Sequence, residues 1–159
     1  MCRNRIGIVA AILLGIQALA GFAGSATAEP LVWNWGHPSP QGNAVFGLAF
    51  QDDRTGWGVA GGGEILRTDD GGETWRLLRR THELTSQLLD LLLLDDGTLI
   101  AGGEGLFRSR DGGYNWEILA TPSAGPFHDL TIRPDGSLSA AGEGGAVVVS
   151  IDGGDTWTE

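Results

Sequence analysis

The sequence predicts an all-β protein made of three consecutive four-stranded antiparallel units. Two observations lead to this fold class: a nine-residue motif occurs three times, and turn signals divide each repeat into short strands. The aspartates of the motif, Asp70, Asp111 and Asp152, are separated by 111 − 70 = 41 and 152 − 111 = 41 residues. The three copies read RTDDGGETW at 67–75, RSRDGGYNW at 108–116 and VSIDGGDTW at 149–157.

Each repeat contains signals for four strands in the same order. An apolar first strand, such as Leu91–Leu94 or Leu130–Ile132, ends at DDG or PDG, which are hairpin signals. A second strand, TLIA or SLSA, ends in glycines, and a third, EILRT, GLFRS or AVVVS, leads into the motif. The fourth strand begins at the tryptophan of the motif. A period of about 40 residues with four strands is typical of a blade of a β-propeller, so we expect an incomplete propeller of three blades.

The first 28 residues are expected to form a secretory signal peptide. Arg3 and Arg5 give a basic start, an almost wholly apolar stretch extends to Ala20, and an A-x-A cleavage site ends at Ala28. The alternative is an uncleaved N-terminal anchor. Because no other segment is long and apolar enough to cross a bilayer, the mature chain is not expected to span a membrane. We therefore expect an exported protein, periplasmic or extracellular.

Composition excludes several classes of partner. The only cysteine, Cys2, lies in the leader, so the mature chain forms no disulfide. Removing residues 1–28 takes away two arginines and no acid, which changes the net charge from 10 − 20 = −10 to 8 − 20 = −12. So acidic a chain is not expected to bind nucleic acid or an anionic membrane.

The repeated motif resembles the Asp-box, or BNR repeat, whose pattern is Ser/Thr-x-Asp-x-Gly-x-Thr-Trp. The first and third copies match it throughout, and the second departs from it only at Asn115, where the pattern has threonine. With GWGVAGGGEILRTDDGGETW at 56–75, the chain from about Leu31 onward resembles the photosystem II stability and assembly factor family. This resemblance implies a β-propeller that binds an unassembled reaction-centre subunit.

Every residue type in the motif has a structural role. The aspartate can accept hydrogen bonds from N–H groups that the tight turn leaves unpaired, and the hydroxyl can lock the same hairpin. The glycine permits a positive φ, and the tryptophan can bury a large ring between neighbouring blades. Calcium needs more oxygen ligands than Asp69 and Asp70 supply, so we predict no metal and no other cofactor. The structural Asp-box residues are Thr68, Asp70, Gly72, Thr74, Trp75, Ser109, Asp111, Gly113, Trp116, Ser150, Asp152, Gly154, Thr156 and Trp157.

The predicted domain organisation places the blades at about 46–80, 86–121 and 126–159. Residues 29–45 precede them and include 31–35, LVWNW, which resembles the fourth strand that closes the last blade of a propeller. Closing the ring takes about four to eight blades. The sequence is therefore expected to be a fragment of a longer propeller, or copies must associate to cover exposed edges.

The face opposite the Asp-boxes is the candidate binding surface. Strand direction alternates, so the Asp-box turns share a face with the tight DDG and PDG hairpins, which leave little room for a ligand. The longer loops, 79–87 and 120–128, lie on the other face, and loops on a rigid scaffold commonly carry binding residues. The candidate partner-binding residues are His82, Glu83, Asp90, His128 and Asp129, joined by Glu64, Glu104 and Glu143 from the glycine turns. Alternatively, these are ordinary solvated loop charges.

Three functions are consistent with these residues. The first is a non-catalytic binding scaffold that holds a protein client, which the family resemblance favours. The second is a glycoside hydrolase, because some sialidases and glucanases carry Asp-boxes. The only tyrosine, Tyr114, lies inside an Asp-box rather than at a sialidase-like site, whereas Asp90 with Asp129 could serve another glycosidase. The third is an inactive repeat remnant. We predict the first function and no catalytic residues.

Overall fold

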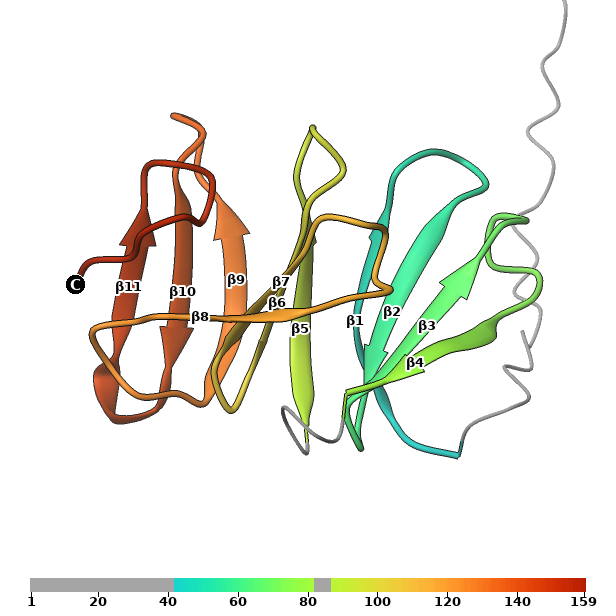
Figure 1. Cartoon of the computed structure of the whole chain (residues 1–159), viewed down its shortest axis with the longest axis horizontal. Helices are drawn as coiled ribbons and strands as arrows, with labels where there is room; N and C mark the ends of the chain where they lie inside the picture. The colour runs from blue at the N-terminus through green and yellow to red at the C-terminus, as the bar shows by residue number, and fades with distance from the viewer. Residues whose placement is uncertain (1–41, 82–86) are drawn as a thin grey trace, which may run out of the picture. The chain divides into compact units, whose positions relative to one another are not determined.

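The computed structural model describes residues 42–81 and 87–159, all of which belong to one compact unit. They form three antiparallel sheets that follow one another along the chain, here called blade 1, blade 2 and blade 3 (Figure 1). The predicted signal peptide, the predicted closing strand at 31–35, and the candidate residues His82 and Glu83 lie outside the described residues.

Each sheet keeps its strands in sequence order, as the turn signals predict. The orders are β1-β2-β3-β4 in blade 1, β5-β6-β7-β8 in blade 2 and β9-β10-β11 in blade 3. The strands are β1 Val45–Phe50, β2 Gly56–Ala60, β3 Glu64–Thr68, β4 Arg76–Arg80, β5 Leu88–Leu93, β6 Leu99–Gly103, β7 Leu106–Ser109, β8 Glu117–Leu119, β9 Phe127–Ile132, β10 Leu138–Gly142 and β11 Val147–Ser150.

The all-β prediction is confirmed, with one difference in blade 3. Its sheet has three strands, and the predicted fourth strand is reduced to a bridge between Val149 and Thr158. The one helical element of the described residues is a 3-10 turn, η1, at Glu143–Gly145. Within 42–81 and 87–159, no helix is both long and apolar enough for a membrane span.

The hairpin turns between the first and second strands follow from local hydrogen bonds. In blade 2 the Asp96 carboxylate accepts the N–H of Thr98, and in blade 3 the Asp135 carboxylate accepts the N–H of Ser137. Gly97 and Gly136 adopt φ values of 84° and 82°, which a residue with a Cβ atom rarely adopts. The DDG and PDG signals therefore encode these turns directly.

The first strands β1, β5 and β9 share a register irregularity that makes their positions equivalent. In each blade the pairing between the first and second strand shifts by one residue near the start of the first strand. Leu48, Leu91 and Leu130 follow the shift and pair with Gly58, Ala101 and Ala140. Val45, Leu88 and Phe127 precede it and form a second equivalent set.

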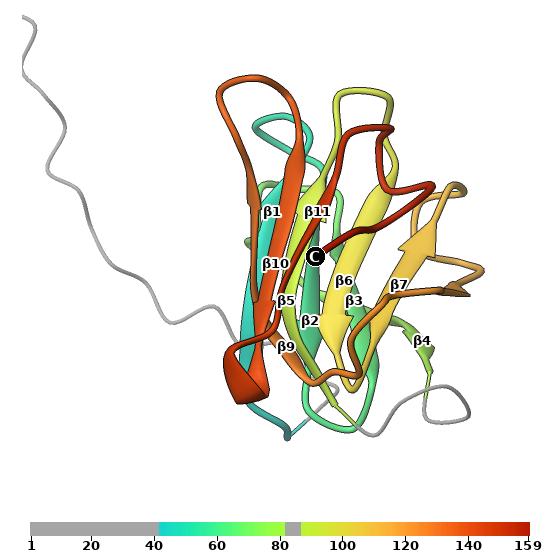
Figure 2. The ribbon, with the colours of Figure 1, turned by 90° about the vertical axis from the view of Figure 1, so that its left-hand side faces the viewer.

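The hydrophobic core lies between the blades, in two clusters. The first strands neighbour one another in the order β1, β5, β9, as Figure 1 shows; Figure 2 looks along the row of blades, so that the first strands overlap. Blade 2 contributes to both clusters, so each of its faces is covered by a neighbour. Between blades 1 and 2 the buried residues are Trp57, Val59, Ile65, Leu88, Leu91, Leu99, Ala101 and Phe107. Between blades 2 and 3 they are Ile100, Leu106, Leu119, Phe127, Leu130, Leu138, Ala140, Val148 and Trp157.

Candidate functional site

The first Asp-box turn is closed by hydrogen bonds between residues two to four apart. The Thr68 hydroxyl donates to the Asp70 carboxylate at 2.7 Å and accepts the N–H of Gly72 at 2.9 Å. The Asp70 carboxylate also accepts the backbone N–H of Thr74 at 2.9 Å and the Thr74 hydroxyl at 2.5 Å. One aspartate thus holds both ends of the turn, which is a structural role.

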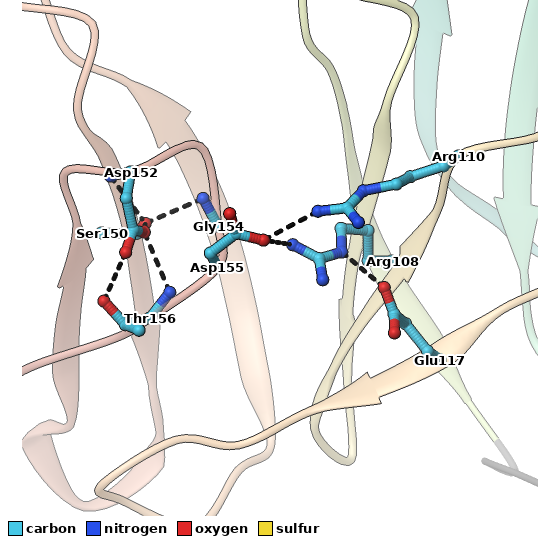
Figure 3. A network of polar contacts seen from close by, with 8 residues as sticks. All are labelled: Arg108, Arg110, Glu117, Ser150, Asp152, Gly154, Asp155 and Thr156. Carbon is cyan, nitrogen blue, oxygen red and sulfur yellow. Dashed lines mark hydrogen bonds and ion pairs between the residues drawn. The ribbon is translucent and has the colours of Figure 1, made fainter.

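The second and third copies repeat this arrangement. In the second, Asn115 donates to Asp111 from its backbone N–H at 2.8 Å and from its side-chain amide at 2.6 Å. Asn115 therefore makes the same two hydrogen bonds to the motif aspartate that Thr74 makes in the first copy. In the third copy, Asp152 accepts the backbone N–H and the hydroxyl of Thr156, and Gly154 donates to Ser150 (Figure 3).

These hydrogen bonds stabilise the charged form of the Asp-box carboxylates. The Thr74 hydroxyl, followed by the Thr74 N–H, lowers the pKa of Asp70 to about 2. In the third copy, the Thr156 hydroxyl and then the Thr156 N–H lower the pKa of Asp152 to about 2. The pKa of Asp111 is also lowered, mainly by the backbone N–H of Asn115. All three are therefore ionised at neutral pH and poorly suited to act as general acids.

The tryptophans of the second and third motifs pack against the preceding blade. Trp116 packs against the cluster between blades 1 and 2, and Trp157 is part of the cluster between blades 2 and 3. Trp75 belongs to blade 1 and meets Phe50 edge-on, with ring centroids 5.9 Å apart. Trp157 is buried, whereas Trp75 and Trp116 are only half-buried and so less covered than the sequence led us to expect.

The second and third Asp-box turns also contact the blade before them through polar groups. In the second motif, the carbonyl of Gly112 accepts the indole N–H of Trp57 at 2.8 Å. In the third, the Asp155 carboxylate accepts hydrogen bonds from Arg108 at 2.6 Å and Arg110 at 2.7 Å (Figure 3). The buried Arg108 additionally donates to Glu117 at 2.7 Å. The motif therefore joins neighbouring blades as well as closing its own turn.

Asp90, predicted at the binding face, has both carboxylate oxygens engaged in the fold. Oδ1 accepts the N–H of Leu91 at 2.8 Å, and Oδ2 accepts the N–H of Leu130 in blade 3 at 2.7 Å. Asp90 is therefore a link between the first strands of blades 2 and 3. The sequence contained a signal that this position matters, because Asp129 occupies the same place in the next repeat, but the N–H that donates to Asp90 lies 40 residues away.

The other described candidates at the end opposite the Asp-boxes are partly exposed and partly buried. His128 and Asp129 are exposed, and the His128 ring lies 3.6 Å from the Glu143 carboxylate on the next turn. The buried Glu64 accepts a hydrogen bond from Arg80 at 3.0 Å, so it holds blade 1 together. Glu104 is exposed as well, so the described candidates that the structure leaves at the surface are Glu104, His128, Asp129 and Glu143.

Grooves occur at both ends of the blades. One of about 370 Å³ lies beside Glu143 and is also lined by Ser123, Ala124 and Val147. Another, of about 380 Å³, lies at the Asp-box end, between the hairpin turns of blades 2 and 3. The sequence did not predict the second groove, because the tight turns were expected to leave little room for a ligand there. Neighbouring turns are separated by the blade interface, and that separation creates the space.

The described carboxylates and histidines do not assemble into a metal centre. Across residues 42–81 and 87–159, no group of three or more His, Cys, Asp or Glu side chains is arranged to hold a metal ion. The Asp-box carboxylates were the sequence's nearest candidates for calcium ligands. Their oxygens instead accept hydrogen bonds from N–H and O–H groups of their own turns.

Comparison with known sequences identifies the repeat. The pattern of the BNR/Asp-box repeat matches residues 66–77, which contain the first motif. The chain carries BNR/Asp-box repeats. Over 35 residues it is 54% identical to the photosystem II stability/assembly factor HCF136, chloroplastic, of Cyanidioschyzon merolae. That stretch is 22% of this chain and 8% of the relative.

Solved propeller structures are similar to most of the chain. YCF48 from Cyanidioschyzon merolae matches with a TM-score of 0.60 and 28% identity, over 76% of this chain and 38% of that one. YCF48 bound to D1 peptide matches with a TM-score of 0.62 and 22% identity, over 75% of this chain and 40% of that one. A GH74 enzyme of Niastella koreensis matches with a TM-score of 0.59 and 21% identity, over 72% of this chain and 22% of that one. The last two show the fold alone, and the chain spans less than half the length of each of these proteins.

Proposed function

We propose that this chain, or a longer protein that includes it, is a non-catalytic propeller scaffold that holds a protein client. The observation that carries the proposal is the 54% identity over 35 residues to a photosystem II stability/assembly factor, together with the similarity to YCF48. The structure of YCF48 bound to D1 peptide supports it, because a propeller of related fold there holds a peptide.

The proposed binding surface is the end of the blades opposite the Asp-boxes. Glu143 lines the groove of about 370 Å³ there and is exposed. His128 and Asp129, neighbours on β9, are exposed as well. A mature chain with a net charge of −12 favours basic client segments, with an affinity that falls as salt screens the charges. We further propose that residues 1–28 direct export, so the client would be met in the periplasm or outside the cell.

The hydrolase alternative has weaker support. Similarity to GH74 enzymes at 21% identity supports the fold and not the reaction. Of the two aspartates proposed for a glycosidase, Asp90 already accepts two backbone N–H groups. A catalytic carboxylate must reach the substrate, and a carboxylate held in this way is poorly placed to do so. An inactive remnant would bind no client and hydrolyse no glycoside.

The test combines client capture with a glycoside assay. Immobilised mature chain is incubated with the exported fraction of the source cells, and captured proteins are identified and then re-tested as purified clients. We expect Glu143→Lys to abolish capture of a purified client, while Glu73→Lys, an equal charge reversal in the exposed turn of the first Asp-box, leaves it unchanged. Equal effects of the two variants would argue against this surface.

The parallel assay uses a panel of glycosides with the same preparation. We expect no turnover. Hydrolysis that disappears in Asp90→Asn or Asp129→Asn would replace the scaffold proposal with the hydrolase, and neither capture nor hydrolysis would indicate the inactive remnant.

A further inference from the structure

We propose that the groove at the Asp-box end, between blades 2 and 3, binds a partner peptide in which a tryptophan is flanked by basic residues. This groove of about 380 Å³ lies at the opposite end of the blades from the surface proposed for the client, so it is a second binding surface. Both of its walls belong to described blades. The chain also contains a filled counterpart of the groove, between blades 1 and 2, which indicates what kind of side chain fits.

Between blades 1 and 2, the space beside the second Asp-box turn is filled by Trp57 and Arg67. The indole N–H of Trp57 donates to the carbonyl of Gly112, the first glycine of that motif, at 2.8 Å. The Arg67 guanidinium lies over the Trp57 ring, 5.1 Å from its centroid. A Cβ atom at Gly112 would meet Arg67 at 3.6 Å and Trp57 at 3.8 Å. An indole with a guanidinium stacked on it therefore occupies this position.

Between blades 2 and 3, the same position is open. Ile100 of β6 has the place in the repeat that Trp57 has on β2. A Cβ atom at Gly153, the first glycine of the third motif, would meet nothing within 4 Å, and Gly153 lines the groove. Arg108 turns instead towards Asp155 (Figure 3). Within residues 42–81 and 87–159, no N–H or O–H group donates to the carbonyl of Gly153, so the acceptor that Trp57 uses in the first interface has no donor here.

The lining of the groove combines apolar and acidic side chains. Ile132 lines it and is 45% exposed, whereas Leu93, at the same place in blade 2, packs against the cluster between blades 1 and 2. The charged residues of the lining are Asp95, Asp96, Asp152, Asp155 and Arg110. Their net charge is 1 − 4 = −3. Asp95 is exposed and makes no hydrogen bond within the part of the chain that the structure describes, so its carboxylate is available to a cation.

These features fit a tryptophan with basic neighbours. Its ring contacts Ile132, and its indole N–H donates to the carbonyl of Gly153, as Trp57 donates to Gly112. The basic side chains complement the acidic lining, as Arg67 accompanies Trp57 in the filled position. Tryptophan and arginine are also the side chains that most often dominate the binding energy of protein interfaces. We commit to a peptide because the filled position shows both groups supplied together by polypeptide side chains.

The experiment titrates the isotope-labelled mature chain with a capped probe peptide, Gly-Arg-Trp-Arg-Gly, and follows the backbone amide signals by NMR. We expect saturable shifts at Gly136 and Gly153, which line the groove, and none at Glu143. Replacing the tryptophan of the probe by glycine, or both of its arginines by glutamate, should weaken binding roughly tenfold or more. Tryptamine, an indole with one positive charge and no peptide, should also bind roughly tenfold more weakly. Equal affinity for tryptamine would overturn the assignment to a peptide.

Variants of the chain locate the contact. Asp95→Lys reverses one acid of the lining and should weaken binding of the probe roughly tenfold or more. Glu73→Lys, the same change of charge in the exposed Asp-box turn of blade 1, is the matched control and should leave binding unchanged. Ile100→Trp places an indole of the chain itself where blade 1 has Trp57, and should abolish binding. Because Ile100 is buried, Ile132→Ala is a second apolar variant at a more exposed position and should weaken binding roughly threefold or more.

Two further outcomes would overturn the proposal. One is the absence of saturable shifts up to roughly 1 mM probe. The other is an equal effect of Asp95→Lys and Glu73→Lys, because only the first residue lines the groove. Glu143→Lys separates this proposal from the client surface: it should abolish capture of a client and leave binding of the probe intact. Binding of the probe that Glu143→Lys removes would assign the peptide to the other end of the blades.

Discussion

Blades 1 and 2 carry the same repeat, but blade 2 packs against a neighbouring blade on both faces and blade 1 on only one face among the described residues. Leu48 and Leu91 occupy equivalent positions of the first strand, yet Leu91 is buried and Leu48 is exposed. Both are leucines, and both pair with a small residue of the second strand. The difference arises because blade 2 has a neighbour on each side. In a repeat fold, burial is therefore a property of the interface between units more than of the unit itself.

Truncating these two leucines should give the largest contrast. Leu91→Ala removes a side chain from the core between blades 1 and 2, and we expect a loss of about 2–5 kcal/mol in the free energy of unfolding. Leu48→Ala should cost less than about 0.5 kcal/mol, because the side chain is largely exposed. Denaturant titrations of the two variants provide the measurement, and similar losses would show that Leu48 is covered in solution.

A smaller contrast is expected between two buried serines. Ser109 lies in the Asp-box of blade 2, and its hydroxyl accepts the N–H of Gly113 at 2.9 Å. Ser109→Ala leaves that N–H without its acceptor and should cost about 1–3 kcal/mol. Ser139 lies on β10 of blade 3, and its buried hydroxyl has no partner among the described residues.

Ser139→Ala is the matched control for this substitution. Because it removes a buried hydroxyl that makes no hydrogen bond within the described part of the chain, we expect a neutral or slightly stabilising effect. The thermal midpoints of both variants give the answer. If Ser139→Ala proved as destabilising as Ser109→Ala, the hydrogen bond to Gly113 would not be the cause of the loss.

The smallest effect should appear as a pH dependence of stability. The pKa of Asp70 and of Asp152 is about 2 in the folded chain, below the usual 3.8. A lowered pKa contributes stability that is present above about pH 4 and is lost as the pH falls from about 4 towards 2. Asp152→Asn removes one such group and should make the thermal midpoint less dependent on pH in this window.

The control for the pH experiment is Glu73→Gln, which removes an exposed carboxylate from the turn of the first motif without removing the carboxylate that closes it. We expect its pH profile to follow that of the unmodified chain more closely than Asp152→Asn does. An unchanged profile in Asp152→Asn would show that the hydrogen bonds from Thr156 do not set this dependence.

The sequence by itself determined the all-β fold class, the order of the strands and the chemistry of the Asp-box turns. These features rest on residues close together in the chain: Thr68, Asp70 and Thr74 lie within one turn, so their spacing encodes their hydrogen bonds. Asn115 illustrates the strength of this local encoding, because its side-chain amide donates where the other copies have a threonine hydroxyl, and its backbone N–H donates as theirs do. The turn signals are likewise local, and the repeat period follows directly from the spacing of the three motifs along the chain.

Only the tertiary structure decided which of these units cover one another. Asp90 was predicted at a binding face, but its carboxylate binds the N–H of Leu130, 40 residues away, and no local pattern specifies that contact. The groove at the Asp-box end and the exposure of Leu48 have the same origin, since each depends on where a neighbouring blade lies. The physical reason is that turn hydrogen bonds form between residues two to four apart, whereas apolar burial between blades joins residues a whole repeat apart.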